Sequence, residues 1–254
     1  MLPAVLALAL AAPECGLPPL ADAPPFRVGE TLAYDLDVLG VVKAGTATLS
    51  VEPPISRGTL LPLRARVRNI SVFAKARHVK GYALSWVDAR TLRPQRYLDD
   101  VEEDGVRKST DTRLDRPGPI TMEWRLGERR GTTTAPRERE VLDLLSAIYY
   151  LRAIRLEPGT RLCFDLVANR RIWRLDGEVA PGHEKVDSAA GSFDTVRVDA
   201  VLTRADGTGT RRPVHFWYGR GEHHLPVAAV SEIDLGPVRA MLARVSGPAT
   251  PPAK

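Results

Sequence analysis

Apolar and polar residues alternate through most of the chain between positions 26 and 245. In the runs 32–38 and 196–202, four apolar side chains occupy every second position. Turn dipeptides such as Asp104-Gly105 and Asp206-Gly207 separate such runs at the spacing of β-hairpins. A period of two indicates strands with one buried and one solvated face, and short turns favour antiparallel pairing.

Residues 137–155 depart from this period and predict a helix. The segment follows Pro136 and contains neither Gly nor Pro, with Glu138 near its start and Arg155 at its end. These residues suit the two ends of a helix. On a helical wheel its apolar side chains cover most of the circumference, which is typical of a helix enclosed on most sides. Nothing between the other runs resembles a crossover helix, so a doubly wound parallel sheet is not expected.

The predicted fold is therefore mainly β: an antiparallel curved sheet or barrel-like β domain with one central α-helix at about 137–155. A chain of 254 residues that is 44% apolar can bury a core without disulfides or metals. The expected organisation is a signal peptide at 1–12, a Pro-rich linker at 13–25, a single β-rich domain at 26–245 and a disordered C-terminal tail at 246–254.

The first residues have the features of an export signal. Positions 2–12 are uncharged and apolar, too short to cross a bilayer as a helix, and small residues at Ala9 and Ala11 suit a signal peptidase. A buried N-terminal helix is the alternative, but the prolines that follow favour an extended linker. We expect an exported protein of the periplasm or outer-membrane periphery, with no transmembrane span in the mature chain.

The chain has two cysteines, Cys15 and Cys163. Cleavage near Ala11 would carry both into an oxidising compartment, where they could pair, although their spacing does not establish a disulfide. A lipid anchor on Cys15 is the other alternative. It is disfavoured because Glu14, which is not a small residue, precedes the cysteine.

Basic residues give a formal net charge of +5, but their distribution does not indicate a nucleic-acid partner. Arg129-Arg130, Arg170-Arg171 and Arg211-Arg212 are isolated doublets. No block of five or six like charges and no basic helical face occurs. We therefore interpret the basic residues as a solvated surface.

No sequence motif identifies a catalytic or metal centre. His215, His223 and His224 are the one local histidine cluster, and neighbouring histidines in a strand point to opposite faces, which disfavours a zinc site. The acidic run at 99–104 is interpreted as a charged hairpin tip rather than a calcium loop. Nucleophile elbows and phosphate-binding loops are absent from the sequence. No cofactor and no catalytic residue are predicted.

Several ordered motifs together resemble a known family. They are Gly29-Glu30-x-Leu32-x-Tyr34, Ala44-Gly45-x-Ala47-x-Leu49, Val87-Asp88-x-x-Thr91-Leu92-x-Pro94 with Tyr97, Val141-Leu142-Asp143-x-Leu145-Ser146-Ala147-x-Tyr149-Tyr150-Leu151-Arg152, Gly191-x-Phe193-Asp194 and Leu225-Pro226-Val227. In this order they resemble the exported bacterial proteins grouped as domain of unknown function 3108 (DUF3108). The resemblance implies export to the cell envelope and a mostly antiparallel β architecture. It implies no activity.

The preferred functional hypothesis is a non-enzymatic binding or assembly module of the envelope. Its curved sheet would hold an apolar small molecule, a lipid or a segment of an envelope protein, with the helix as a lid or plug. The alternative for the helix is that it simply completes the core. The candidate ligand contacts lie around the helix: Asp143, Ser146, Tyr149, Tyr150 and Arg152.

Two further hypotheses stay open. One is a hydrolase of envelope polymers that uses carboxylates such as Asp88, Asp99 or Asp143. Asp143 lies on the narrow polar side of the helix, where burial would raise its pKa. The other is a purely structural component of the envelope.

Overall fold

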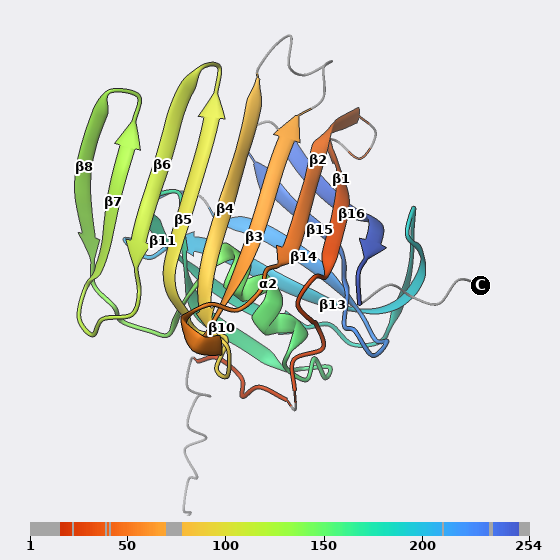
Figure 1. Cartoon of the computed structure of the whole chain (residues 1–254). Coiled ribbons are helices and arrows are strands. Elements are labelled where there is room, and N and C mark those ends of the chain that lie inside the picture. The colour runs from red at the N-terminus through yellow and green to blue at the C-terminus, as the bar shows by residue number, and fades with distance from the viewer. Residues whose placement is uncertain are drawn as a thin grey trace, which may run out of the picture.

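One curved antiparallel sheet surrounds a short helix and accounts for nearly all the regular structure (Figure 1). The computed structural model describes residues 16–21, 23–38, 40, 42–69, 78–209, 211–233 and 236–248. The predicted signal peptide, Cys15 and the end of the predicted tail lie outside the described residues. Export therefore stays a prediction, the pairing of Cys15 with Cys163 stays open, and the lipid anchor on Cys15 stays the disfavoured alternative.

The first half of the sheet is a meander in which each strand is antiparallel to the next, apart from a short 3-10 turn, η1 (Ser56–Gly58). Alternating side chains and short turns favour this arrangement. Its strands are β1 (Thr31–Val38), β2 (Val42–Val51), β3 (Leu60–Asn69), β4 (Val79–Asp88), β5 (Pro94–Glu103), β6 (Val106–Arg113), β7 (Ile120–Leu126) and β8 (Arg129–Ala135).

The second half follows the helix α2 (Leu144–Arg152) along the chain, except for β9, which directly precedes it. Strand β9 pairs with β10 in parallel, and the remaining pairs of this half are antiparallel. Its strands are β9 (Val141–Asp143), β10 (Arg161–Ala168), β11 (Arg171–Val179), β12 (Glu184–Ser188), β13 (Gly191–Arg204), β14 (Arg212–Gly219), β15 (Pro226–Ile233) and β16 (Gly236–Ser246).

Strand β1 joins the two halves because it pairs with both β2 and β16. The resulting order is β8-β7-β6-β5-β4-β3-β2-β1-β16-β15-β14-β13-β11-β10-β9, with β12 paired to β13 beside this path. Among the described residues, the end strands β8 and β9 do not pair with each other, so the sheet is curved but not closed. The predicted fold class is confirmed.

The helix is shorter than predicted at both ends. Residues 141–143 form β9, and the predicted first-turn residue Glu138 lies before that strand, so its interpretation as a helix-start residue was wrong. The helix begins after Asp143, whose side chain satisfies the free backbone N–H groups of the first turn. It ends at Arg152, with Ala153 as the C-cap.

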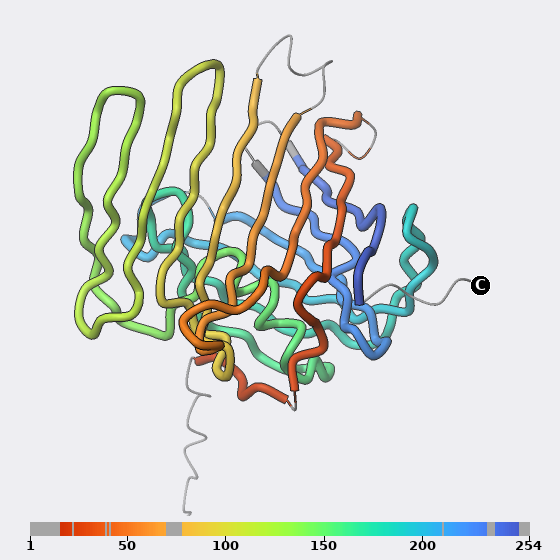
Figure 2. Tube along the Cα trace, viewed as in Figure 1, coloured from red at the N-terminus to blue at the C-terminus, as the bar shows by residue number. Residues whose placement is uncertain are grey.

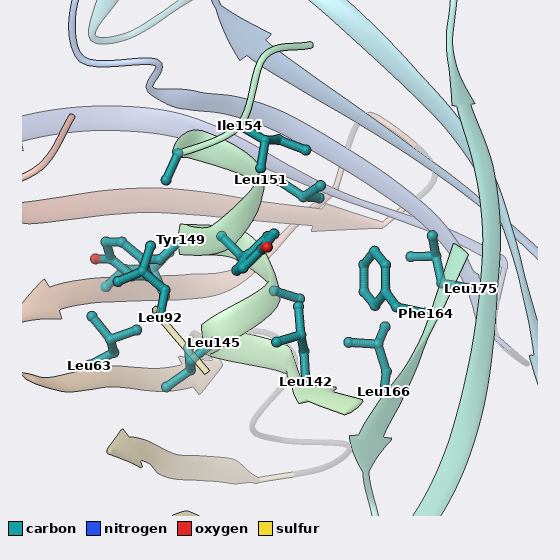
Figure 3. Close-up of a cluster of buried hydrophobic side chains, with 14 of the residues drawn as sticks. Leu63, Leu92, Leu142, Leu145, Tyr149, Leu151, Ile154, Phe164, Leu166 and Leu175 are labelled. Carbon is teal, nitrogen blue, oxygen red and sulfur yellow. The ribbon is translucent and has the colours of Figure 1, made fainter. Parts of the chain in front are cut away.

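The core lies between the two halves of the sheet and contains the helix (Figure 3). Both faces of the helix contribute, which agrees with the wide apolar arc in its sequence. Fully or almost fully buried residues include Leu63 and Leu92 from the first half, Leu142, Leu145, Tyr149, Leu151 and Ile154 around the helix, and Phe164 and Leu175 from the second half.

Residues 16–21, which the sequence predicts as part of a linker, lie against the end of the helix (Figure 2). The backbone N–H of Ala21 donates to the carbonyl of Ala153 at 2.7 Å. Leu17 and Leu20 are partly buried against the core. This segment therefore contributes to packing of the domain.

Candidate functional site

Asp143 anchors the start of the helix and is completely buried. Its Oδ1 accepts hydrogen bonds from the backbone N–H groups of Leu145 and Ser146, both at 2.9 Å. Its Oδ2 accepts from the hydroxyl of Ser85 on β4 at 2.5 Å. Ser146 completes a capping box, because its hydroxyl accepts from the backbone N–H of Asp143 at 2.9 Å.

Burial raises the pKa of Asp143 to about 6, although the hydrogen bonds from Ser85, Ser146 and Leu145 act in the opposite direction. A raised pKa in a cleft would favour a general acid. Here both oxygens serve the helix cap and the contact with β4, and the residue lines none of the five cavities described below. The geometry therefore explains Asp143 as a structural cap that joins the helix to the first half of the sheet.

Arg152 at the other end of the helix forms a buried ion pair with Glu30. Both side chains have 0% exposure. The guanidinium contacts both carboxylate oxygens, with Nη2 donating to Oε2 at 2.9 Å and Nη1 bonded to Oε1. Nη2 also donates to the carbonyl of His223 at 2.9 Å. This one side chain thus connects the helix to the start of β1 and to the β14–β15 loop.

Aromatic rings surround the buried pair. The guanidinium carbon of Arg152 lies 5.1 Å from the ring centroid of Phe26 and 5.2 Å from that of Tyr149. The two rings meet edge to face, with centroids 4.9 Å apart. Rings placed over a desolvated cation add to its stabilisation.

The two tyrosines of the helix point to different surroundings. The Tyr149 hydroxyl is buried, and no described residue accepts or donates a hydrogen bond to it. The Tyr150 hydroxyl donates to the carbonyl of Pro18 at 2.8 Å and so fixes the 16–21 segment. Of the residues predicted around the helix, all five are buried: Asp143, Ser146, Tyr149, Tyr150 and Arg152.

The interior around the helix is packed, and the apolar surface of the concave face extends beyond it. On β3, Leu63 is buried near the helix, whereas Ala65 on the same face is half-buried. On β2, Leu49 is buried and Ala47 is half-buried, and Ala83 continues the row on β4. The helix therefore covers one end of the concave face and leaves small apolar side chains partly accessible at the other.

Polar groups occupy the same concave face toward the end strand β8. Asp99 on β5 pairs with Ala83 and Thr110, and Trp124 on β7 lies opposite Thr110. Burial raises the pKa of Asp99 to about 6, while the Thr110 hydroxyl and the charge of Arg170 lower it. The guanidinium carbon of Arg170, from the β10–β11 turn, lies 5.1 Å from the Trp124 ring centroid. Arg170 thus crosses from the second half of the sheet to the first.

A cavity of about 460 Å³ lies where the two ends of the open sheet approach each other. We call it the seam cavity. Strands β7 and β8 contribute one wall, and the β10–β11 turn and the end of β13 contribute the other. It is lined by Met122, Thr133, Thr134, Ala135, Pro136, Glu138, Asp165, Arg170, Arg171, Ile172, Arg204, Ala205 and Asp206.

Sequence reasoning did not find the seam cavity, since it interpreted Arg170-Arg171 as a solvated doublet. The signal available in the sequence was the turn at Asn169 and Arg170, which has two residues and no glycine. Such a turn requires positive φ at both positions, which glycine and asparagine adopt most easily.

Other cavities lie on or near the outer surface. One of about 600 Å³ is lined by residues of β2 to β6. Most of them are polar, such as Arg66, Tyr82 and Asp100, and the others are Ala47, Val67 and Gly81. One of about 580 Å³ borders residues 18–21, one of about 150 Å³ borders Ile154, and one of about 350 Å³ borders β5 to β8.

The other sequence candidates have local partners. Oδ1 of Asp88 accepts a hydrogen bond from the backbone N–H of Thr91 at 2.8 Å. Burial raises the pKa of Asp88, but hydrogen bonds of this kind together lower it by more, so that the pKa lies below its ordinary value. Nδ1 of His215 lies 2.6 Å from Oδ1 of Asp199. Nδ1 of His224 lies 2.9 Å from the carbonyl of Arg152. Within the described ranges, no group of three or more His, Cys, Asp or Glu side chains could hold a metal, and no helix is long and apolar enough to cross a membrane.

These features define a class of protein: an open, curved β-sheet that is braced internally by a capped helix and a buried arginine–glutamate pair. The chain belongs to the family described as protein of unknown function (DUF3108), whose model matches residues 33–243. No curated protein matches the sequence.

One solved structure shares the fold at low sequence identity, and another aligns with a lower score. A β-barrel-like protein of domain of unknown function DUF1849 from Brucella abortus aligns with a TM-score of 0.58 and 12% identity, over 86% of this chain and 97% of that one. A protein from Bacteroides fragilis, described as exported and of YmcC-like fold, gives a TM-score of 0.35 and 12% identity, over 92% of this chain and 100% of that one. The first likeness supports the fold alone.

Proposed function

We propose that this protein is a non-enzymatic, exported binding module of the cell envelope that holds an apolar ligand on its concave face. The observation that carries the proposal is the change of exposure along that face. Leu49 and Leu63 are buried beside the helix, whereas Ala47, Ala65 and Ala83 are only half-buried beyond it. A concave apolar surface with a few polar groups at one end is the usual form of a small-molecule site.

Small side chains support this role. The half-buried row contains alanines, and further along the face Gly81 lies on β4. A Cβ built on Gly81 would lie 2.9 Å from the backbone carbonyl oxygen of Asp100, so the strands approach too closely there for a larger residue. The row therefore forms a shallow apolar floor, on which a flexible chain or a flat molecule would bury apolar area.

The non-enzymatic part of the proposal is supported by two of the three candidate carboxylates, Asp143 and Asp88. Asp143 is engaged on both oxygens by the helix cap and by Ser85. Asp88 accepts hydrogen bonds within its own turn. Export rests on the apolar sequence at 2–12, and residence in the periplasm or at the outer-membrane periphery rests on the same segment.

The test is binding of an uncharged apolar fluorophore, N-phenyl-1-naphthylamine, to the purified chain, together with mass spectrometry of an organic extract of natively purified protein. We expect saturable binding and a co-purifying apolar molecule. Ala47→Gln and Ala83→Gln place a polar amide on the apolar floor. Each should weaken fluorophore binding by about tenfold, since burying an unpaired amide costs roughly 1–2 kcal/mol.

Thr48→Gln is the matched control, because Thr48 follows Ala47 on β2 and points to the opposite face. It should leave binding unchanged, and circular dichroism should show all three variants folded. If Thr48→Gln weakens binding while the alanine variants do not, the ligand lies on the outer face. If neither the fluorophore nor a co-purifying molecule is found, the binding role is refuted.

A further inference from the structure

The seam cavity has two basic side chains, Arg170 and Arg171, that form no ion pair with the carboxylates that line it. Asp165 and Glu138 are both taken up by one residue, Arg174, whose Nε lies 3.2 Å from Oδ1 of Asp165 and whose Nη2 lies 3.1 Å from Oε2 of Glu138. Arg174 is not among the residues that line the cavity. Two of the three carboxylates at the cavity therefore share one cation, which lies outside its lining.

The third carboxylate, Asp206, pairs with Arg204 at 2.5 Å and also accepts from the backbone N–H of Thr208 at 3.0 Å. Arg170 and Arg171 form no ion pair with any carboxylate of the described part of the chain. Arg170 and Arg171 therefore line the cavity without a salt bridge, and the four arginines 170, 171, 174 and 204 exceed the three lining carboxylates by one charge. The charge of Arg170 also acts on Asp99 beside the cavity.

Arg204 provides a second, independent observation. Its Nε is buried, and no described residue accepts a hydrogen bond from it. A buried N–H without an acceptor is rare in folded proteins, and a bound ligand is one of its standard explanations. Arg204 is one of the residues that line the seam cavity.

The backbone of the β10–β11 turn is the third observation. Asn169 and Arg170 have φ of +51° and +59°. Side chains other than glycine rarely adopt this left-handed region, and asparagine tolerates it better than arginine does. The disfavoured conformation of Arg170 places its guanidinium over Trp124, at the border between the seam cavity and the concave face. Strained backbone held by its surroundings is typical of binding sites.

Apolar side chains share the cavity with these arginines. Met122, Ala135 and Ile172 line it. Trp124 lies in the same row as Ala83 across the strands, with the polar residues Thr110 and Asp99 between them. An occupant of the seam cavity would thus meet positive charge and apolar surface together.

We infer that the seam cavity binds the anionic head group, a carboxylate or a phosphate, of a single-chain amphiphile whose apolar chain lies on the concave face. This inference rests on the proposed function, because it names the chemical class of the ligand for the same concave site. Arg170 and Arg171 supply the charge, and Arg204 supplies a buried N–H donor. A guanidinium binds both anions through paired N–H groups.

The test compares four probes by isothermal titration calorimetry of the full chain, each below its critical micelle concentration where one exists: hexadecanoate, hexadecyl phosphate, hexadecanol and inorganic phosphate. We expect at least one of the two charged amphiphiles to bind about tenfold or more tightly than hexadecanol, which is the effect of one charge-assisted hydrogen bond. Raising the salt concentration should weaken only the charged probes.

Arg170→Gly removes the guanidinium and gives the left-handed position the residue that accepts it most easily. This variant should fold, with an unchanged or higher melting temperature, and should bind the charged amphiphiles no more tightly than hexadecanol. Arg57→Gly is the matched control, because Arg57 also has positive φ, at +58°, and lies in η1 away from the seam cavity. It changes net charge equally and should leave binding unchanged. Arg171→Gln is a second variant with the same expected loss and no change of backbone preference.

Each outcome decides one proposal. Equal binding of hexadecanol and both charged amphiphiles overturns the head-group site and leaves the apolar site intact. Binding of inorganic phosphate as tight as that of hexadecyl phosphate overturns the amphiphile and assigns a free anion. Loss of binding in Arg57→Gly equal to that in Arg170→Gly shows a general charge effect and also overturns the inference. If none of the four probes binds, the proposed function fails with it.

Discussion

Breaking the buried ion pair between Glu30 and Arg152 is expected to remove a large part of the stability of this fold. Glu30→Gln keeps the shape of the side chain and removes its charge, so Arg152 stays in a position with 0% exposure and without a counter-charge. The amide can replace one acceptor of the pair but not both. The His223 carbonyl and the rings of Phe26 and Tyr149 remain in contact with the guanidinium.

The magnitude follows from this burial. Removing one partner of a buried pair typically costs about 3–5 kcal/mol, because the remaining charge is desolvated and uncompensated. Domains are stable by about 5–15 kcal/mol in total, so either Glu30→Gln or Arg152→Met should shift the unfolding midpoint strongly. The double variant leaves no unpaired charge. Its cost should fall short of the sum of the single costs by about 3 kcal/mol or more.

Equilibrium unfolding in urea, followed by far-UV circular dichroism, measures all four members of this double-mutant cycle. The control is Asp111→Asn on the outer face, where Arg96 makes a two-pronged contact of the same chemistry with Asp111 but both side chains are partly exposed. An exposed pair contributes about 1 kcal/mol or less. If Glu30→Gln costs no more than Asp111→Asn, or if the two single costs add in the double variant, the pair is not desolvated in the way the structure indicates.

Two further substitutions test the cap and the close strand contacts. Burial raises the pKa of Asp143 to about 6 from roughly 4 in an unfolded chain, so its stabilising contribution is complete below about pH 4 and is lost as the pH rises through 6. The loss corresponds to about 3 kcal/mol. Asp143→Asn keeps an acceptor for the cap, so its free energy of unfolding should vary with pH between 4.5 and 7.5 by about that much less than the wild type's. A variant whose free energy of unfolding runs parallel to that of the wild type over this range would contradict the raised pKa of Asp143. Gly45→Ala should destabilise by about 1–3 kcal/mol, because a Cβ there would lie 2.5 Å from the backbone oxygen of Arg68. In the control, Gly221→Ala, the added Cβ meets nothing within 4 Å, and an equal loss of stability in both variants would refute the steric argument.

The period of two was sufficient to predict the fold class, since it reports which face of each strand is buried. The runs at 32–38 and 196–202 lie within β1 and β13, as expected. The helix boundaries were not predictable in the same way. An acidic residue such as Glu138 suits the first turn of a helix on general grounds. Here the helix starts later, at the capping box of Asp143 and Ser146, because β9 before it pairs with β10 and Ser85 bonds to Asp143. Tertiary contacts therefore set the boundary.

The candidate residues around the helix were identified by their position, but their contacts were not predictable. Nothing in the sequence pairs Arg152 with Glu30, because 122 positions separate them and the pairing depends on how β1 passes the end of the helix. The seam cavity was missed for a related reason. It is formed by segments from both ends of the open sheet. The turn without glycine at 169–170 signals an unusual backbone, but it does not show what the side chains of the 170–171 doublet face.

The motifs that carry the family resemblance form contacts with one another in the structure. Glu30 of the first motif pairs with Arg152 of the helical motif, and the hydroxyl of Tyr34, also in the first motif, donates to the carbonyl of Pro226 in the last at 2.7 Å. Such contacts hold the two halves of an unclosed sheet around the helix, so these motifs specify the fold. The arginines of the seam cavity lie outside every motif. The type of head group that binds is therefore expected to be specific to this chain. A member of the family that keeps the Glu30–Arg152 and Tyr34–Pro226 contacts but has different residues at 170, 171 and 204 should keep the fold and bind a different head group.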